Sequence, residues 1–222
     1  MTNLVGKTVL VTGASSGLGE QLALAVASQG ANVVLAARRR ERLTQVADQC
    51  RLLSKGQAVA ITCDVGHVAD VDHVFTTIDE LFGQLDVVIN AAGFGDMTTV
   101  ITMDAPVMAK MLRVNTLGTM YVSQLAAQRM VKQHAGEIVN IASMAGKIAT
   151  PKSAVYAASK AAIIAYDNAL RLELKDAHVN VLTVNPGPIK TDFFKIADPT
   201  GHYLDRVHQL ALNPAKLSLI TI

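Results

Sequence analysis

The chain has 222 residues, of which 50% are hydrophobic, enough for one globular domain with a sizeable core. Its 20 Lys and Arg residues nearly balance its 18 Asp and Glu residues, and a net charge of +2 gives no global reason to expect nucleic acid as a partner. Cys50 and Cys63 belong to no CxxC motif or His/Cys cluster, so we expect neither a metal site nor a disulfide framework. Free thiols are typical of the cytoplasm, where we expect the protein, and no apolar run approaches the ~20 residues that span a bilayer.

Short β-branched runs alternate with longer segments of helical period along the chain. Their continuous hydrophobicity is typical of strands buried on both faces, and the intervening segments, such as 20–29 and 159–175, are rich in Ala, Leu and Gln. The alternation predicts a doubly wound parallel sheet, a Rossmann fold with three α/β/α layers, in one domain over residues 1–222. The predicted strands are 8–11, 32–36, 59–62, 86–89, 137–141 and 179–184.

A glycine-rich stretch follows the first predicted strand. Gly13, Gly17 and Gly19 have the spacing GxxxGxG, wider than the more common GxGxxG fingerprint. A tight turn needs glycine where φ is positive or where a side chain would collide with a phosphate. The helix expected to begin near Gly17 would present backbone N–H groups to an anion. The stretch therefore predicts a pyrophosphate site, although an ordinary strand-to-helix turn would also explain the spacing alone.

The second predicted strand is followed by Ala37 and then by Arg38–Arg40. In doubly wound dinucleotide sites, an acidic residue at this strand end accepts hydrogen bonds from the ribose 2′-hydroxyl. Ala37 occupies that place, and Arg38 can form charge-assisted bonds to a 2′-phosphate, with Ser15 as a further hydroxyl donor. The pattern predicts a preference for NADP(H) over NAD(H). A solvated start of the next helix would explain Arg40 and Arg42, but not the missing acid.

Tyr156 and Lys160 lie four residues apart in a stretch that reads as helix. They would share one face, displaced by about 6 Å along the axis. A lysine ammonium near a phenol favours the phenolate and lowers the tyrosine pKa from about 10, which suits general acid/base chemistry. Taken alone, the pair is more often a half-buried aromatic and a solvated charge. Ser143 follows the fifth strand, at the sheet end where such folds place ligands, although capping or a turn is its ordinary role.

Four motifs in sequence resemble the short-chain dehydrogenase/reductase family over about residues 7–191: TGxxxGxG from Thr12, Asn90–Gly93, YxxxK from Tyr156 and the pair Pro186-Gly187. The resemblance implies hydride transfer between a nicotinamide and a carbonyl or secondary alcohol. It implies catalytic roles for Asn115, Ser143, Tyr156 and Lys160.

In the family, Tyr156 is the general acid/base, Ser143 orients the substrate oxygen, and Asn115 holds a water that links Lys160 to bulk solvent. A turn between two helices is the alternative explanation of Asn115. Ala91 departs from the family, which more often has Asn there. Residues and resemblance together predict cofactor contacts at Gly13, Ser15, Ser16, Gly17, Leu18, Gly19, Arg38, Arg39, Asp64, Val65, Asn90, Ala91, Ala92, Gly93, Tyr156, Lys160, Pro186, Gly187, Ile189 and Thr191; for Asp64 a plain strand-ending cap is equally compatible.

A non-catalytic NADP-binding module that senses redox state or binds a partner is the alternative function. Such proteins usually lack one catalytic residue, whereas all four are present here, so an enzyme is favoured. After Pro186, the residues Phe193, Phe194 and Ile196 predict an apolar lid over an apolar carbonyl substrate, with a surface loop as an equal alternative.

The end of the chain carries a further expectation. Family members usually continue with a last helix and a seventh strand, whereas this chain stops at Ile222. We expect a shortened C-terminus, with the sixth strand either a bare edge or paired with the apolar tail. A bare edge favours association. The expected assembly is a homodimer or homotetramer through residues 115–134 and 153–175.

Overall fold

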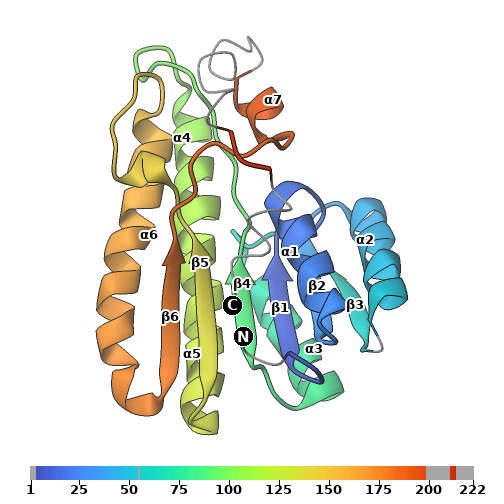
Figure 1. The fold of residues 1–222 in the computed structure, drawn as a ribbon. Coiled ribbons are helices and arrows are strands. Elements are labelled where there is room, and N and C mark those ends of the chain that lie inside the picture. Colours follow the sequence, from blue (N-terminus) through green and yellow to red (C-terminus); the bar gives the residue numbers. More distant parts are fainter. Residues whose placement is uncertain (1–3, 55, 199–210, 214–222) are drawn as a thin grey trace.

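The computed structural model describes residues 4–54, 56–198 and 211–213. Six parallel strands form one sheet in the order β3-β2-β1-β4-β5-β6 (Figure 1). Every strand begins and ends within one residue of the predicted position. The order reverses between β1 and β4, the point at which doubly wound folds bind ligands. The strands are β1 (Thr8–Thr12), β2 (Asn32–Ala37), β3 (Ala58–Thr62), β4 (Val87–Asn90), β5 (Gly136–Ile141) and β6 (Val179–Val184).

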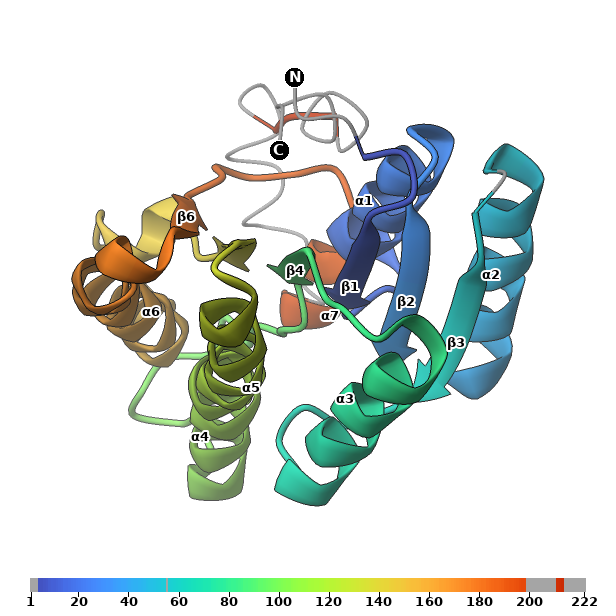
Figure 2. The same cartoon turned by 90° about the horizontal axis from the view of Figure 1, so that it is seen from below.

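Helices cover both faces of the sheet, as Figure 2 shows, so the predicted three-layer α/β/α fold is confirmed. Helices α1 (Gly17–Ser28) and α2 (Arg40–Leu53) lie on one face. Helices α3 (Val68–Phe82), α5 (Thr119–Gln133) and α6 (Ala154–Glu173) lie on the other. The short helix α7 (Phe193–Ala197) lies beyond the carboxyl ends of the strands.

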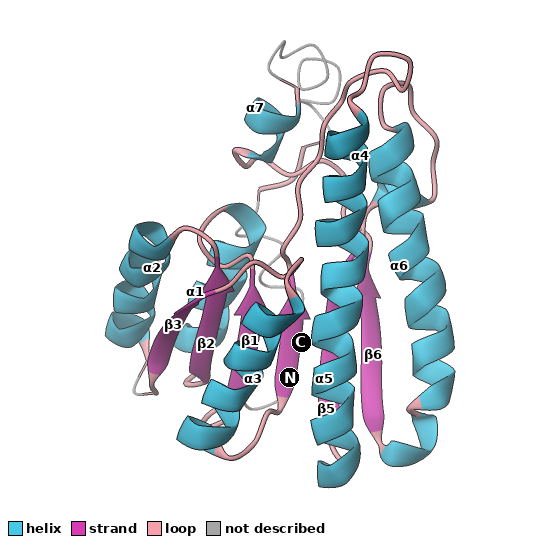
Figure 3. Ribbon diagram, turned by 180° about the vertical axis from the view of Figure 1, so that it is seen from behind, coloured by secondary structure: helices cyan, strands magenta, loops and turns pink. Residues whose placement is uncertain are grey.

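The helix that carries Asn115 is continuous through that residue (Figure 3). Helix α4 (Ala105–Leu112) runs into a π-helical turn, Arg113–Gly118, which runs into α5. The alternative of a turn between two separate helices is therefore wrong. A π-bulge inserts one extra residue into a helix and is frequent at functional sites, because it aims a side chain away from the regular helical direction.

Side chains on the α3/α5/α6 face form two rows across the sheet. In the lower row, the register partners Leu10, Val88, Ile138 and Val181 are all buried in one apolar cluster. Two residues further along each strand, the register partners are polar: Thr12, Asn90, Asn140 and Thr183. This second set, which we call the polar row, lies directly beneath the loops that follow the strands. It departs from the purely apolar interior expected of a parallel sheet.

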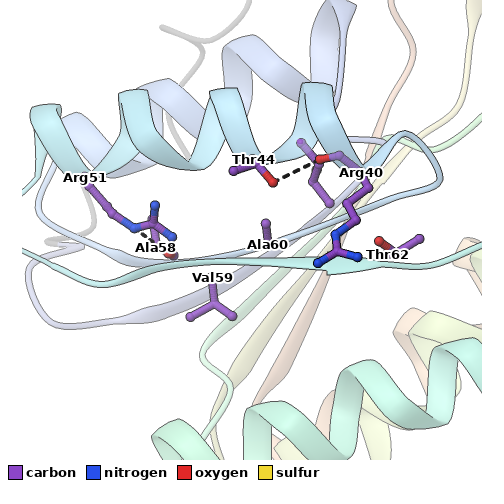
Figure 4. A pocket seen from close by; sticks show the side chains of 8 residues that line it. Arg40, Thr44, Arg51, Ala58, Val59, Ala60 and Thr62 are labelled. Carbon is purple, nitrogen blue, oxygen red and sulfur yellow. Dashed lines mark hydrogen bonds between the residues drawn. The ribbon is translucent and has the colours of Figure 1, made fainter.

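An arginine covers each edge of the sheet. Arg51 extends from α2 over β3, where its Nε and Nη2 donate to the carbonyl of Ala58 at 3.0 and 2.7 Å (Figure 4). On the opposite edge, Nε of Arg171 donates to the carbonyl of Val181 at 2.9 Å. Charged side chains that occupy edge carbonyls oppose pairing with another strand. Among the described residues β6 is an edge strand but not a bare one, and the tail from 214 to 222 lies outside the described residues.

Candidate active site

Three glycines allow the turn after β1 to pack against the loop after β4. Gly13 and Gly17 have φ values of +69° and +60°, which disfavour any side chain. A Cβ on Gly13 would lie 2.7 Å from the Cα of Ala92, and a Cβ on Gly19 would lie 2.5 Å from the carbonyl oxygen of Gly13. The turn and the first N–H groups of α1 therefore form a backbone cradle at the carboxyl end of β1, with the Thr191 side chain near Gly17. Such a cradle fits a dinucleotide pyrophosphate.

Arg39 rather than Arg38 reaches this turn. Its Nε and Nη2 donate to Oγ of Ser15 at 3.3 and 3.2 Å, and Nη2 donates to Oγ of Ser16 at 2.5 Å. Arg38 is exposed and makes no hydrogen bond or ion pair within the described chain. Ala37 is buried at the end of β2 and brings no carboxylate to the site. Arg39 and the hydroxyls of Ser15 and Ser16 thus lie together just after the end of β2, where Ala37 stands in place of the acidic residue of NAD-selective sites.

Tyr156 and Lys160 are brought together on the buried face of α6. Lys160 is only 6% exposed, and its Nζ donates to the carbonyl of Ile141 at the end of β5 at 2.8 Å. The same Nζ lies 5.9 Å from the centroid of the Tyr156 ring. Burial lowers the pKa of Lys160 from 10.5 to about 8. The interpretation of Lys160 as a solvated surface charge is therefore wrong.

Asn115 is fully buried and fixes the loop after β4. Its Oδ1 accepts from the backbone N–H of Phe94 at 2.9 Å, and its Nδ2 donates to the carbonyl of Phe94 at 2.8 Å and to Oγ of Ser159 at 3.1 Å. A Cβ on Gly93 would lie 3.2 Å from Oδ1 of Asn115 and 3.6 Å from Nζ of Lys160. Asn115, Lys160 and the loop from Asn90 to Gly93 therefore meet at Gly93, where a side chain would crowd Oδ1 of Asn115.

Ser143 caps a short turn at the end of β5. Its Oγ accepts from the N–H of Ala145 at 3.1 Å, which is the ordinary capping role considered for it. The next residue, Met144, donates its N–H to the carbonyl of Pro186 at 3.0 Å. Ser143 is thus held between β5 and the turn after β6. Accepting one bond leaves the hydroxyl hydrogen available to a ligand.

The remaining predicted cofactor residues occupy the same carboxyl edge of the sheet. Oδ1 of Asp64 accepts from the N–H of Gly66 at 3.0 Å, so this carboxylate serves as the strand-ending cap. Val65 is buried against Gly118, where a Cβ would lie 2.7 Å from its Cγ2. A Cβ on Gly17 would lie 3.5 Å from Thr191 Cβ, which brings the turn after β6 to the start of α1. Leu18 lies in the first turn of α1, and Ala91, Pro186, Gly187 and Ile189 lie in the loops after β4 and β6.

Helix α7 is docked over Tyr156. The Phe193 and Tyr156 ring centroids are 5.6 Å apart, and Phe193 also packs on Gly95, where a Cβ would lie 2.7 Å from its ring. The N–H of Met97 donates to the carbonyl of Ala197 at 2.7 Å. Ile196 is 69% exposed, so its predicted place on the inner face is wrong, because a helix that buries Phe193 and Phe194 turns Ile196 outward. The segment beyond Asp198, with His202 and Tyr203, lies outside the described residues.

Sequence reasoning missed two groups of residues. Three methionines join Phe194 and Tyr156 in one buried cluster. A buried polar group lies beneath the catalytic loops, and its signal was a carboxylate, Asp167, seven residues after Lys160 on the same face of α6. Over the described part of the chain, the helices are too short or too polar to cross a membrane. The residues missed are Met97, Met103, Met111, Ser123, Asn140, Asp167 and Thr183.

Comparisons with known proteins agree with this geometry. The family model described as short chain dehydrogenase matches residues 7–200. An uncharacterized oxidoreductase of Staphylococcus aureus strain USA300 is 36% identical over 200 residues, 90% of this chain and 85% of the relative. An uncharacterized oxidoreductase of Staphylococcus saprophyticus is 38% identical over 193 residues, 86% of this chain and 82% of the relative.

Two crystal structures share the fold over nearly the whole chain. A short-chain type dehydrogenase/reductase from Mycobacterium marinum superimposes with a TM-score of 0.90 at 31% identity, covering 97% of this chain and 87% of the other. A short-chain dehydrogenase/reductase from Burkholderia phymatum, solved in complex with NAD, has a TM-score of 0.89 at 27% identity, covering 98% and 85%. The chain belongs to the short-chain dehydrogenase/reductase family and is an NAD(P)-dependent oxidoreductase.

Proposed function

We propose that the protein is an NADP(H)-dependent oxidoreductase that interconverts an apolar carbonyl compound and its secondary alcohol, with Tyr156 as the general acid/base. The observation that carries the proposal is the buried ammonium of Lys160. It lies beside the Tyr156 ring and is held by the carbonyl of Ile141. A buried lysine without a carboxylate partner is costly, and such groups are typical of functional sites.

In the direction of reduction, the Tyr156 phenol donates its proton to the substrate oxygen, and a nicotinamide bound after β1 and β4 would supply the hydride. The positive charge of Lys160 stabilises the negative charge left on the phenol oxygen. The Ser143 hydroxyl donates to the same substrate oxygen and orients it. Asn115 fixes the loop through Phe94 and keeps Gly93 close to Lys160. In the reverse direction Tyr156 accepts the alcohol proton.

The preference for NADP(H) is supported by the end of β2. A 2′-phosphate placed there would meet no carboxylate at Ala37 and would meet the guanidinium of Arg39 beside two serine hydroxyls. Arg38 is exposed and can turn to the same phosphate. Arginine suits this task because its planar donors match phosphate geometry.

An apolar substrate is supported by the composition of the cluster around Tyr156. Its buried members besides Tyr156 are Met97, Met103, Met111, Phe194 and Ala197. Phe193 lies half-buried against the catalytic ring. Methionine adapts its shape to irregular apolar groups, so this wall suits an aliphatic or aromatic carbonyl compound better than a sugar or an acid.

The test is a substrate screen with purified protein. The loss of reduced-cofactor absorbance at 340 nm is followed with a panel of ketones and aldehydes, once with NADPH and once with NADH. We expect turnover of apolar members with NADPH. Turnover restricted to charged sugars or acids would contradict the apolar substrate, and tight NADPH binding without turnover of any member would favour the non-catalytic alternative.

We further propose a homodimer or homotetramer that forms through α5 and α6. Exposed apolar side chains on these helices and on the π-helical turn between α4 and α5 support this surface, among them Leu117, Val131 and Leu172. Light scattering is the test, and a strict monomer at high concentration would contradict it.

We also propose that the protein works in the cytoplasm. Cys50 and Cys63 are free and buried, and burial raises the pKa of these thiols to about 11 and about 12. Thiols kept reduced are typical of that compartment. Fractionation of cells that express the protein tests this location, and recovery outside the cytoplasmic fraction would contradict it.

A further inference from the structure

The polar row beneath the active site is one connected hydrogen-bond network. Oγ1 of Thr12 donates to Oδ1 of Asn90 at 3.4 Å. Nδ2 of Asn90 donates to Oδ1 of Asn140 at 2.8 Å and to Oγ of Ser123 at 3.1 Å. Nδ2 of Asn140 then donates to Oδ1 of Asp167 at 2.6 Å. The network therefore crosses from β1 through β4 to β5 and reaches α6 at Asp167.

Asp167 closes the network towards β6. Oδ2 of Asp167 accepts from Oγ1 of Thr183 at 2.7 Å, and Nη2 of Arg171 donates to the same Thr183 oxygen at 3.1 Å. The Asp167 side chain is fully buried and makes no ion pair with any of the described residues. Burial raises the pKa of Asp167, whereas the bonds from Asn140 and Thr183 and the charge of Arg171 lower it. Nothing in the proposed proton transfer uses this carboxylate, although it costs free energy to bury.

The network contacts the catalytic and cofactor loops at their bases. Asn140 directly precedes Ile141, whose carbonyl holds Nζ of Lys160. Asn90 begins the loop that ends at Gly93, and Oγ1 of Thr12 accepts from the N–H of Ala92 in that loop at 3.2 Å. A shift of the Asn140 side chain would therefore move both the carbonyl that holds Lys160 and the loop that ends at Gly93.

We infer that Asp167 is a positioning residue, which holds the end of β5 through Asn140 and so fixes Lys160 against Tyr156. Asn140 can direct its oxygen towards Asn90 only while its amide nitrogen has an acceptor on the other side. Asp167 is that acceptor, and the helix that carries it also carries Tyr156 and Lys160. Helix α6 thus carries both the pair Tyr156 and Lys160 and the carboxylate that fixes the position of this helix relative to β5. The inference rests on the proposed function for its kinetic readout, but not for its structural one.

The first measurement needs no substrate. Amide hydrogen exchange is followed over residues 139–143 in the wild type, in Asp167→Ala and in Asp167→Asn. Asparagine keeps the shape, but one of its two polar atoms becomes a donor, so it cannot accept from both Asn140 and Thr183. The control is Leu170→Ala, a buried change one turn further along the same helix that leaves the network intact.

We expect exchange over 139–143 to become at least tenfold faster in both Asp167 variants and to stay within about threefold of the wild type in Leu170→Ala, because loss of a buried acceptor frees the network locally. Equal exchange rates over 139–143 in all four proteins would overturn the inference. It would also be overturned if the Asp167 variants accelerated exchange over the whole sheet and no more at 139–143 than Leu170→Ala does. If Asp167→Ala does not fold, Asp167→Asn decides alone.

The second measurement is kinetic. With the best substrate of the screen, kcat should fall about tenfold or more in Asp167→Asn, with KM and the NADPH Kd within about threefold, because small displacements of catalytic groups act on kcat. Leu170→Ala leaves the network intact and should keep kcat within about twofold of the wild type. If Asp167→Asn keeps the kcat of the wild type, the inference is overturned. If the wild type itself turns over no substrate, the proposed function is contradicted, and the hydrogen-exchange measurement still tests the inference.

Discussion

The polar row on the α3/α5/α6 face spans β1, β4, β5 and β6, whereas its continuation on β2 and β3 is apolar. Register partners of Thr12 on β2 and β3 are Ala36 and Ile61, which are buried in the apolar cluster. On β4 and β5 the same row continues as Asn90 and Asn140. The strands are otherwise alike in length and direction, so the difference lies in what their carboxyl ends must hold.

The β1–β3 half can hold a cofactor with backbone and exposed cations. Glycines and the start of α1 form its anion cradle, and Arg39 lies at the surface. The β4–β6 half must instead keep Lys160 buried beside Tyr156 in one geometry. A buried charge needs fixed dipoles around it, and a satisfied polar network supplies rigidity that apolar packing does not. Variants in the first half should therefore act on cofactor affinity, and variants in the second on kcat.

The largest effect is expected for Tyr156→Phe in the catalytic half. The ring stays against Phe193 and the proton donor is lost, so turnover should fall by at least ~100-fold. The NADPH Kd, measured by fluorescence titration, should change less than about threefold. Near-normal turnover in this variant would remove Tyr156 from the chemistry.

Smaller but selective effects are expected for the arginines of the cofactor half. Arg39→Ala and Arg38→Ala should each weaken NADPH binding roughly tenfold or more, the scale of one charged hydrogen bond, and leave NADH almost unchanged. Because neither side chain contacts Tyr156 or Lys160 in the structure, kcat at saturating NADPH should stay within about twofold. A wild type that binds NADH as tightly as NADPH would contradict the preference.

A pH effect should belong to the catalytic half alone. Because burial lowers the pKa of Lys160 to about 8, the ammonium loses its proton as pH rises through that value, and carbonyl reduction should fall about tenfold per pH unit above it. The rate should be independent of pH well below 8. Rates of reduction measured from pH 6 to 10 give the profile, and one that stays flat to pH 10 would show that Lys160 does not titrate in the reaction.

The smallest effect is expected at Phe193, beside the apolar cluster around Tyr156. Phe193→Ala removes a ring that packs on Tyr156 and on Gly95, so KM for apolar substrates should rise about fivefold to tenfold with little change for small polar carbonyl compounds. An equal change in KM for both substrate groups would mean that Phe193 does not contact the substrate. Ile196→Ala, a change at an exposed side chain of the same helix α7, is the matched control.

The sequence predicted the two halves unequally, for physical reasons. Strand limits follow from local β-branched runs, and Gly13 and Lys160 stand in spaced motifs that a linear pattern can reveal. Arg39 could not be ranked above Arg38, since the direction of a side chain after a strand depends on the turn that follows. Ile196 was assigned to the wrong face because the phase of a five-residue helix is set by its docking, not by its own sequence.

The polar row was beyond linear reasoning. Thr12, Asn90, Asn140 and Thr183 come from four strands that are far apart in the sequence, and only the register of the sheet aligns them. Asp167 gave a local signal, a carboxylate on the buried face of a helix. Its partners could be named only once the order of β4, β5 and β6 was known.

The assignment of cofactor affinity to the β1–β3 half and of kcat to the β4–β6 half is tested most directly by a double-mutant cycle between Arg39→Ala and Tyr156→Phe. The NADPH Kd and kcat are measured for the wild type, the two single variants and the double variant. We expect the first change to act on Kd and the second on kcat, and their effects to add within ~0.5 kcal/mol, as for distant sites without shared partners. This expectation would be contradicted if Tyr156→Phe weakened NADPH binding as much as Arg39→Ala does, or if the two changes were coupled by more than ~1 kcal/mol.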